Sequence, residues 1–354
     1  KKIGLTALGT SLVAGSAYAG EITASGDAGY TWSSEERGVR TDEGYGFNHD
    51  ITFSGSGELD NGFTVSTTMI LTEDSGLSSS NVALTMGGMG TITIGNGLAN
   101  IGGAYDDVTP RAYEENSDGM ATAGALDSVG TLMDGNAILY SSPSFDVAGG
   151  SASFKFAYSP ENGDSATGEG AVAAQSNIYD SGMALGIDVT YGGLSVGAFA
   201  DEVKDAQGET TNDGRRDAMS ATWYANYSMG PVSVGYQTGG LDRGLATAAT
   251  AATAAKTVAA AGGNFEFEKM SIAFNVNENL SISWGELEET YDAQSNVKGG
   301  TEIADVEMSS TSIQFAYTMG SMSIKGYQTD TDNPGWDSNA KSDEVTELAV
   351  NFAF

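Results

Sequence analysis

The sequence contains no cysteine, and lysine and arginine together account for only 15 of its 354 residues. Without cysteine, neither a disulfide framework nor a thiolate metal site can form. Aspartate and glutamate number 47, which gives a formal net charge of -32. The chain therefore lacks the clustered basic side chains that a nucleic-acid partner requires. The acidity fits two alternatives: a solvated surface adapted to salt, or a functional preference for cations.

Long hydrophobic runs are also missing from most of the chain. After residue 19 no apolar stretch reaches the roughly eighteen residues that a membrane-spanning helix needs. The first residues, KKIGLTALGTSLVAGSAYA, begin with two lysines, continue with an apolar stretch and end on a small-x-small cleavage pattern. This order is typical of a secretory signal peptide rather than of a short membrane anchor. We predict a signal peptide over residues 1–19 and one domain over residues 20–354.

Alternation of apolar and polar residues fills that domain. In the last eight residues, ELAVNFAF, one face is apolar and the other is polar or small: Leu348, Val350, Phe352 and Phe354 alternate with Glu347, Ala349, Asn351 and Ala353. A period of two indicates a strand with one apolar face. About sixteen segments show this pattern, which predicts a protein built from strands.

The connections between these segments alternate in length. ELDNGF, YGGL and SMGPV are tight turns, whereas long acidic or glycine-rich stretches lie between the hairpins. Short turns at one end and long loops at the other are typical of a barrel whose outer face contacts lipid and whose lumen holds water. Aromatic residues near strand ends, such as Trp32 and Tyr45, match interfacial girdles. We predict an all-β fold, a closed antiparallel transmembrane β-barrel of about sixteen strands.

With these features the chain resembles the general diffusion porins of Gram-negative outer membranes, most of all the alphaproteobacterial type. The resemblance rests on the segment EITASGDAGYTW, on GNAILYSSPSF followed by a new strand, and on the terminal Phe354, and it extends over nearly all of the domain. It implies an outer-membrane homotrimer in which ions and small hydrophilic solutes diffuse passively through each barrel. It also implies that the third long loop folds into the lumen and narrows it.

The segment that matches this constriction loop runs from Leu98 to Gly135. It is too long, and too rich in alanine, methionine and tyrosine, for an ordinary solvated loop. We expect its acidic residues to set the electric field at the constriction: Asp106, Asp107, Glu114, Glu115, Asp118 and Asp127. The alternative for each of them is a position that faces bulk water.

The sequence departs from the family pattern in its basic residues. Inward positions on the second and third predicted strands include Asp50 and Glu58 and carry no arginine ladder. The nearest cations are few: Arg37 and Arg40 in the first loop, Arg111 in the constriction loop, and Lys155 and Lys325 on inward faces. Because carboxylates in a narrow aqueous pore attract cations, we predict a cation preference. Screening over about 8 Å at physiological salt should keep it modest.

Two further features of the sequence bear on catalysis and metal binding. The single His49 points outward by parity, beside Phe47, so we predict no catalytic residues. The acidic stretch that contains Asp330 and Asp332 resembles a calcium loop, but the ligand pattern of an EF-hand is broken after these residues. No cofactor is required, and calcium bound loosely by acidic loops stays an alternative.

The prediction is therefore a passive diffusion porin in the Gram-negative outer membrane, with lipid, two further copies of itself, and small hydrophilic solutes and ions as partners. A substrate-specific channel is the first alternative, and it needs paired charges or a row of aromatics along the lumen. Inward aromatics are few by parity: Phe199, Tyr224 and Tyr327. An outer-membrane barrel enzyme or a structural surface protein sealed by its loop are the remaining alternatives.

Overall fold

The computed structural model describes residues 22–37, 40–72, 76–96, 101–116, 129–130, 132–133, 136–160, 179–205, 217–242, 244, 264–292 and 305–354. The predicted signal peptide lies outside these residues. Within them the chain forms one antiparallel sheet. Its strands are β1 (Thr23–Arg37), β2 (Arg40–Glu58), β3 (Thr64–Leu71), β4 (Leu77–Thr85), β5 (Thr91–Asn96), β6 (Asn136–Ser141), β7 (Phe145–Val147), β8 (Gly150–Ser159), β9 (Tyr179–Tyr191), β10 (Leu194–Asp205), β11 (Ala218–Met229), β12 (Val232–Asp242), β13 (Asn264–Asn275), β14 (Leu280–Asp292), β15 (Val306–Met319), β16 (Met322–Asp332) and β17 (Asp343–Ala353). Short 3-10 turns lie at η2 (Gly87–Met89), η3 (Gly102–Ala104) and η7 (Pro334–Trp336). No helix in the described part of the chain is both long enough and apolar enough to cross a membrane.

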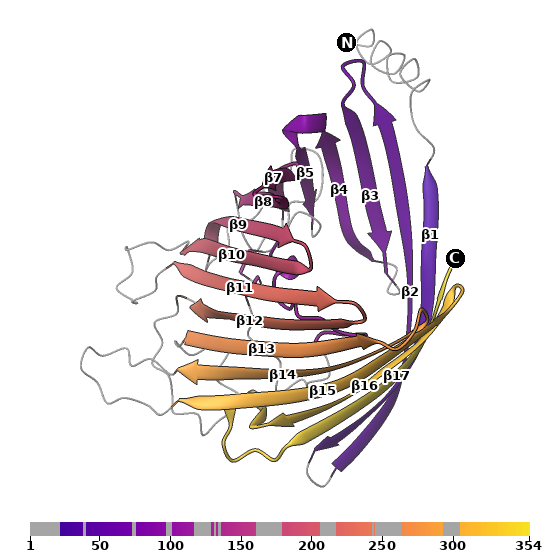
Figure 1. Ribbon diagram of the computed structural model, residues 1–354, viewed down its shortest axis with the longest axis vertical. Helices are drawn as coiled ribbons and strands as arrows, with labels where there is room; N and C mark the ends of the chain where they lie inside the picture. The colour runs from indigo at the N-terminus through magenta and orange to yellow at the C-terminus, as the bar shows by residue number, and fades with distance from the viewer. Residues whose placement is uncertain are drawn as a thin grey trace, which may run out of the picture.

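The sheet closes on itself because β1 pairs with both β2 and β17 (Figure 1). Trp32 lies opposite Leu348 in the closing pair. Beyond that ladder, the amides and carbonyls of Gly26 and Phe354 exchange two hydrogen bonds of 2.8 and 2.9 Å. Closure leaves no open edge in the sheet that the described residues form, as the hydrocarbon of a membrane demands. The alternating last strand is thus the partner of the first, and the predicted closed barrel is confirmed.

Two of the seventeen strands in the described sheet, β6 and β7, share one position in the barrel. Both β6 and β7 pair with β8, and the bend between them contains Pro143. At the bend the Ser142 hydroxyl oxygen accepts a hydrogen bond from the Phe154 amide at 2.9 Å, in place of a backbone carbonyl. Proline is tolerated in a sheet at such a break because it has no N–H to donate. The barrel therefore has sixteen strand positions, as predicted.

Inner and outer faces follow the alternation read from the sequence, and β13 shows it clearly. Met270, Ile272 and Phe274 face outward and are exposed, whereas Phe267 and Lys269 face inward and are buried. The outward apolar residues form the surface that lipid covers. Polar inward residues meet water or the loop that lies inside the barrel.

Connections segregate by end. The β9–β10, β11–β12 and β15–β16 turns each hold two residues, and Gly192, Gly230 and Gly320 take positive φ angles of 57°, 60° and 61° there. We expected Arg37 and Arg40 in the first loop, but both belong to strands. Arg37 and Arg40 lie opposite each other at the ends of β1 and β2, because backbone pairing continues above the apolar band through polar residues.

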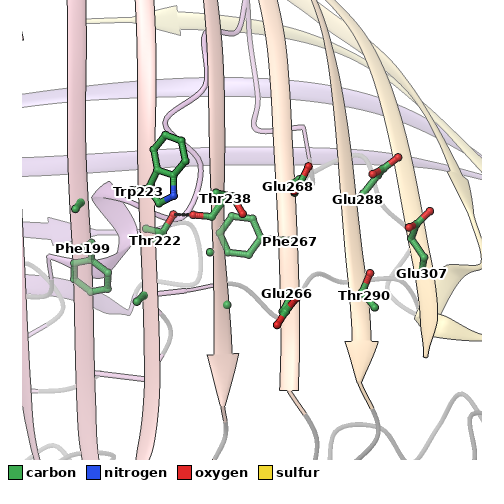
Figure 2. A pocket seen from close by; sticks show the side chains of 14 residues that line it. Phe199, Thr222, Trp223, Thr238, Glu266, Phe267, Glu268, Glu288, Thr290 and Glu307 are labelled. Atoms are coloured by element: carbon green, nitrogen blue, oxygen red, sulfur yellow. Dashed lines mark hydrogen bonds between the residues drawn. The ribbon is translucent and has the colours of Figure 1, made fainter. Parts of the chain in front are cut away.

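On the outer face, a row of carboxylates marks where this apolar band ends. A groove of about 740 Å³ is lined there by Trp223 together with Glu266, Glu268, Glu288 and Glu307 (Figure 2). Glu268 lies directly opposite Glu288 on the neighbouring strand. Since charged side chains on the lipid face are costly at hydrocarbon depth, this row indicates the border of the hydrocarbon on β13–β15.

The apolar core lies inside the barrel. One cluster joins Leu132 of the long loop to Trp336 and to the inward face of β10–β15. Trp336 is 6 % exposed, and its ring centroid lies 5.0 Å from that of Phe265 and 6.2 Å from that of Tyr291. The β16–β17 connection thus folds inward as well and narrows one mouth of the lumen.

Candidate functional site

The candidate site is the inside of the barrel, where residues 101–116 cross the strands of one wall. Tyr105 begins the crossing. Its hydroxyl donates to Asp188 Oδ2 at 2.6 Å, and its ring stacks on Phe199 with centroids 5.2 Å apart. Gly186 leaves the necessary room, because a Cβ there would lie 2.5 Å from the Tyr105 hydroxyl oxygen. Burial, followed by the Asp188 carboxylate, raises the pKa of Tyr105, which stays a hydrogen-bond donor.

Side chains on β12 and β13 hold the next part of the loop. Gln237 donates to the carbonyl of Tyr105 at 2.6 Å and accepts from the amide of Val108 at 3.0 Å. Lys269 donates to the carbonyl of Asp106 at 2.6 Å. These bonds satisfy backbone groups that a loop inside a barrel could not otherwise pair. Asn226 and Ser271 add bonds to two further loop carbonyls, those of Val108 and Pro110.

The tip of the loop is fixed by β14, β15 and β17. The amide of Ala112 donates to Ser283 Oγ at 2.9 Å, and the amide of Tyr113 donates to Gln314 Oε1 at 3.0 Å. The Tyr113 hydroxyl donates to Glu347 Oε1 at 3.0 Å. The loop therefore advances from strand to strand along one wall and reaches the strands beside β1.

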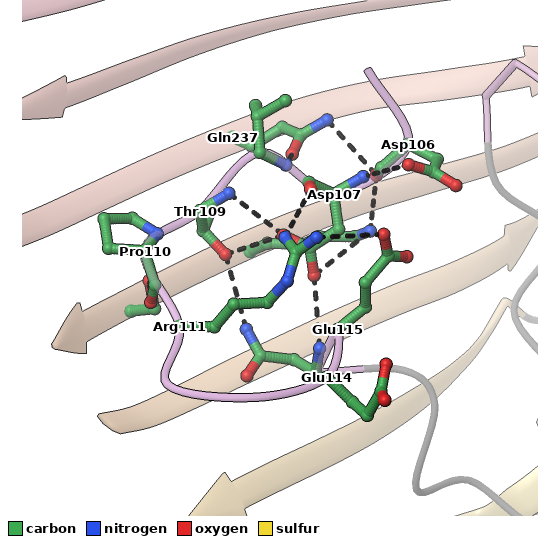
Figure 3. Close-up of polar contacts among 12 residues, drawn as sticks. Asp106, Asp107, Thr109, Pro110, Arg111, Glu114, Glu115 and Gln237 are labelled. Carbon is green, nitrogen blue, oxygen red and sulfur yellow. Dashed lines mark hydrogen bonds and ion pairs between the residues drawn. The ribbon is translucent and has the colours of Figure 1, made fainter. Parts of the chain in front are cut away.

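Charged residues of the loop are organised around Asp107 (Figure 3). The carboxylate of Asp107 is 0 % exposed and lies 3.8 Å from both Arg111 Nη1 and Lys269 Nζ. Thr109 donates to its Oδ1 through the amide at 3.0 Å and the hydroxyl at 2.7 Å. Arg111 also pairs with Glu115 at 3.2 Å. We expected Asp107 to set the field at the constriction, but its carboxylate is buried and neutralises the cations that hold the loop.

Asp106, next to it, has a different environment. Its Oδ1 accepts a hydrogen bond from the amide of Asp107 at 2.8 Å. Burial nevertheless raises the pKa of Asp106, since removal from water penalises the ionised form more than that bond and nearby Lys269 favour it. Asp106 therefore takes up a proton more readily than an ordinary aspartate.

The returning part of the loop packs on its beginning. The amide of Gly130 donates to Ser220 Oγ at 3.4 Å, and Ser220 in turn donates to Asp201. A Cβ at Gly102 would lie 2.4 Å from Gly130 Cα. The two glycines let the outgoing and returning backbones touch.

Other predicted site residues have separate places. Lys325 extends over the Tyr113 ring, with Nζ 4.9 Å from the centroid, and Lys155 lies 6.0 Å from the Tyr105 centroid. Glu114 and Glu115 lie at the loop tip and are partly exposed, and Glu58 is exposed at the turn end of β2. Arg37 pairs with Glu35 at 2.6 Å at the mouth. Asp118 and Asp127, and the side chain of Arg40, lie outside the described residues.

Three more predicted positions concern the β1–β2 hairpin and β16. Asp50 Oδ1 is buried on the inner face and has no hydrogen-bond partner among the described residues. His49 faces outward with its ring 5.4 Å from that of Phe47. Asp330 and Asp332 occupy exposed, outward positions of β16, and Asp332 accepts from Ser342 at 2.5 Å. Among the described residues no group of three or more His, Asp or Glu side chains is arranged to hold a metal ion.

The residues that anchor the loop were missed by the sequence reading. They are polar side chains at inward positions of strands: Asn226, Gln237, Lys269, Ser271, Ser283 and Gln314. The sequence does contain one signal of these anchoring residues. In FEFEKMSIAF, Lys269 shares the parity of Phe265 and Phe267, so a charge points inward among apolar residues. A buried lysine requires a partner, and the acidic loop is the nearest source.

A closed barrel with an apolar outer band and a polar loop pinned inside it defines a membrane channel. The sequence matches the family described as Gram-negative porin over residues 4–293, and the chain belongs to that family. It is a passive diffusion channel of the outer membrane. A comparison with curated proteins found no significant match.

Solved structures show the same fold. A porin refined at 1.8 Å shares 18 % identity with a TM-score of 0.58, covering 94 % of this chain and 100 % of that one. Salmonella typhi OmpF in complex with daunomycin shares 15 % identity with a TM-score of 0.63, covering 95 % and 98 %. Vibrio cholerae OmpT in its trimer form shares 10 % identity with a TM-score of 0.57, covering 94 % and 99 %. At such identities the likeness concerns the fold alone.

Proposed function

We propose that this channel prefers cations, and that its constriction is formed by residues 101–116 and the wall that faces them. The observation that carries the proposal is the pairing of Asp107 with Lys269 and Arg111. The buried Lys269 pairs with Asp107 of the loop. A second loop carboxylate, that of Glu115, pairs with Arg111. The positive charges of Lys269 on the wall and of Arg111 in the loop are thereby compensated.

What is left around the lumen is mainly acidic. The carboxylates of the described inner face outside that cluster include those of Asp27, Asp50, Asp106, Glu114, Asp188 and Glu347. Against them stand the ammonium groups of Lys155 and Lys325. An excess of carboxylate in an aqueous pore raises the local concentration of cations and lowers that of anions.

Reconstitution in a planar bilayer tests the preference. The reversal potential across a potassium chloride gradient should have the sign of a cation-selective channel, and Glu114→Gln should reduce it. Asp60→Asn in the exposed β2–β3 turn is the control, because it removes the same charge away from the constriction. A reversal potential of the opposite sign would overturn the cation preference while leaving the channel itself in place.

We also propose a homotrimer. Support comes from Vibrio cholerae OmpT, a structural neighbour solved in a trimer form. Whatever its oligomeric state, the channel needs no catalysis and no cofactor, since a concentration gradient drives the solute. The outward position of His49, beside Phe47, supports this reading. Migration of unheated and heated protein on a denaturing gel tests the trimer, and a monomer under both conditions would refute it.

A further inference from the structure

A second feature of the lumen lies beside the loop tip and carries both signs of charge. A cavity of about 490 Å³ opens between this tip and the wall made by β16, β17, β1 and β2. Its lining includes Asp27, Thr31, Asn48, Glu114, Lys325 and Asn351. Carboxylates, amides, a hydroxyl and an ammonium group therefore converge on one space inside a channel.

The oxygen-rich side of the cavity is built over Gly29. This residue lies between Asn48 and Asn351 on the neighbouring strands. A Cβ at Gly29 would lie 2.2 Å from Asn48 Oδ1 and 2.0 Å from Asn351 Oδ1. Both amides therefore lean over the same glycine, and their oxygens meet there. Asp27, the next inward residue of β1, places a carboxylate beside them.

The cationic side is held by the loop. Lys325 lies on β16 next to the strand of Asn351, and its Nζ is 4.9 Å from the centroid of the Tyr113 ring. Tyr113 is itself fixed through its hydroxyl to Glu347 at 3.0 Å. In the described part of the chain the Lys325 ammonium group rests on this ring and pairs with no carboxylate. It is therefore positioned and still available to an anionic group.

We propose that this cavity is a subsite for small zwitterionic solutes, of which free amino acids are the simplest. The ammonium group of such a solute meets Asp27 and the oxygens over Gly29, while its carboxylate meets Lys325. A neutral sugar gains neither charge-assisted contact, and a simple ion gains one and is repelled by the other. The proposal rests on the channel function and adds a solute class to it.

Binding at this subsite must be weak for transport to continue. The cavity is open to the lumen water, so each charged contact replaces hydration and contributes little net free energy. A weak site raises the local concentration of the solute without trapping it, as conduction requires. The expected result is faster passage for the zwitterion rather than a block.

Swelling of liposomes that contain the full chain measures this passage. L-glutamine, a zwitterion, is compared with L-arabinose, a neutral sugar of similar mass. We expect glutamine to enter about two- to tenfold faster, the factor that a single net hydrogen bond supplies. Lys325→Gln and Asp27→Asn should each abolish the difference. Their charge-matched controls, Lys341→Gln and Asp60→Asn at exposed positions, should retain it.

A third variant separates geometry from charge. Gly29→Ala pushes the two amides apart without altering any charge and should also abolish the preference for glutamine. Gly44→Ala is its control on the neighbouring strand, because a Cβ there meets only Ser33 Oγ at 3.8 Å. Heat-dependent gel migration shows whether each variant has folded.

The outcomes are distinct. Equal entry of both solutes into liposomes whose channels conduct would overturn the subsite and leave the channel function intact. Loss of the preference in the two charge controls as well would assign it to net charge and overturn the subsite. An absence of conductance in the wild-type protein would overturn the channel function and the subsite together.

Discussion

Lys269 and Asp107 form a buried ion pair between the barrel wall and the loop inside it. Their side chains are 1 % and 0 % exposed, with Nζ 3.8 Å from Oδ2. Lys269 also donates to the carbonyl of Asp106 at 2.6 Å. One wall residue thus fixes both the backbone and the charge of the loop. The position of the loop, and with it the width of the pore, depends on this contact.

Lys269→Met should release the loop from β13. The substitution leaves Asp107 buried without one of its two cations, and removing one partner of a buried pair typically costs about 3–5 kcal/mol. We expect a lower free energy of unfolding in urea and a larger, noisier single-channel conductance. Adding Asp107→Asn to the same chain should recover part of the stability, because the uncompensated charge is gone. An unchanged conductance in the single variant would show that Lys269 does not position the loop.

Gly102 and Gly103 provide a matched pair of substitutions. A Cβ at Gly102 would lie 2.4 Å from Gly130 Cα and from its carbonyl oxygen, whereas a Cβ at Gly103 would meet nothing within 4 Å. Gly102→Ala should separate the two legs of the loop and change the conductance, and Gly103→Ala should behave like wild type. Single-channel recordings of both variants test this difference in conductance. Equal effects would mean that backbone freedom, rather than close approach, is what these glycines supply.

The closed barrel could be predicted from the sequence because its signals are local. Alternation fixes which face of each strand is apolar, and turn residues fix where the strands end. The break at Pro143 and the continued pairing of Arg37 with Arg40 could not be read in this way. Polar residues lie on both faces there, so a period of two no longer distinguishes strand from loop.

The site was harder to predict for a physical reason. The acidic loop residues could be named, but their roles depend on which wall residue each one meets across the lumen. Asp107 and Asp106 are neighbours in sequence, yet the first is neutralised by Lys269 and Arg111 and the second is not hydrogen-bonded to either through its carboxylate. Contacts between residues more than a hundred positions apart carry no local signal. Only the inward parity of Lys269 pointed to them.

The hydrogen bond from Tyr113 to Glu347 should restrict the motion of the loop tip. Tyr113→Phe keeps the ring under Lys325 and removes a bond to a charged acceptor, which contributes about 1.5–3 kcal/mol. We expect increased open-channel current noise with little change in mean conductance. Tyr327→Phe removes the second bond to Glu347, at 3.3 Å, from a wall residue and serves as the control. Equal noise in both variants would show that the loop tip is held by its backbone bonds alone.

Asp106 should make the cation preference sensitive to acid. Burial raises its pKa above the usual 3.8, so Asp106 takes up a proton at a pH where ordinary aspartates are still ionised. The folded state then binds more protons than the unfolded state between these two pKa values. The contribution of Asp106 to the free energy of unfolding is therefore present at low pH and is lost as the pH rises through the raised pKa.

The same titration should be visible in the pore. As the pH is lowered from about 7 towards about 4, the reversal potential of the wild-type channel should fall in an early step, at a higher pH than that at which an ordinary aspartate takes up a proton. Asp106→Asn should lack that step and should be at least as stable as wild type near neutral pH, because a buried charge has been replaced by a neutral group of the same shape. Asp60→Asn should keep the step. An early step that persists in Asp106→Asn would assign the titration to another carboxylate of the lumen and overturn the role given to Asp106.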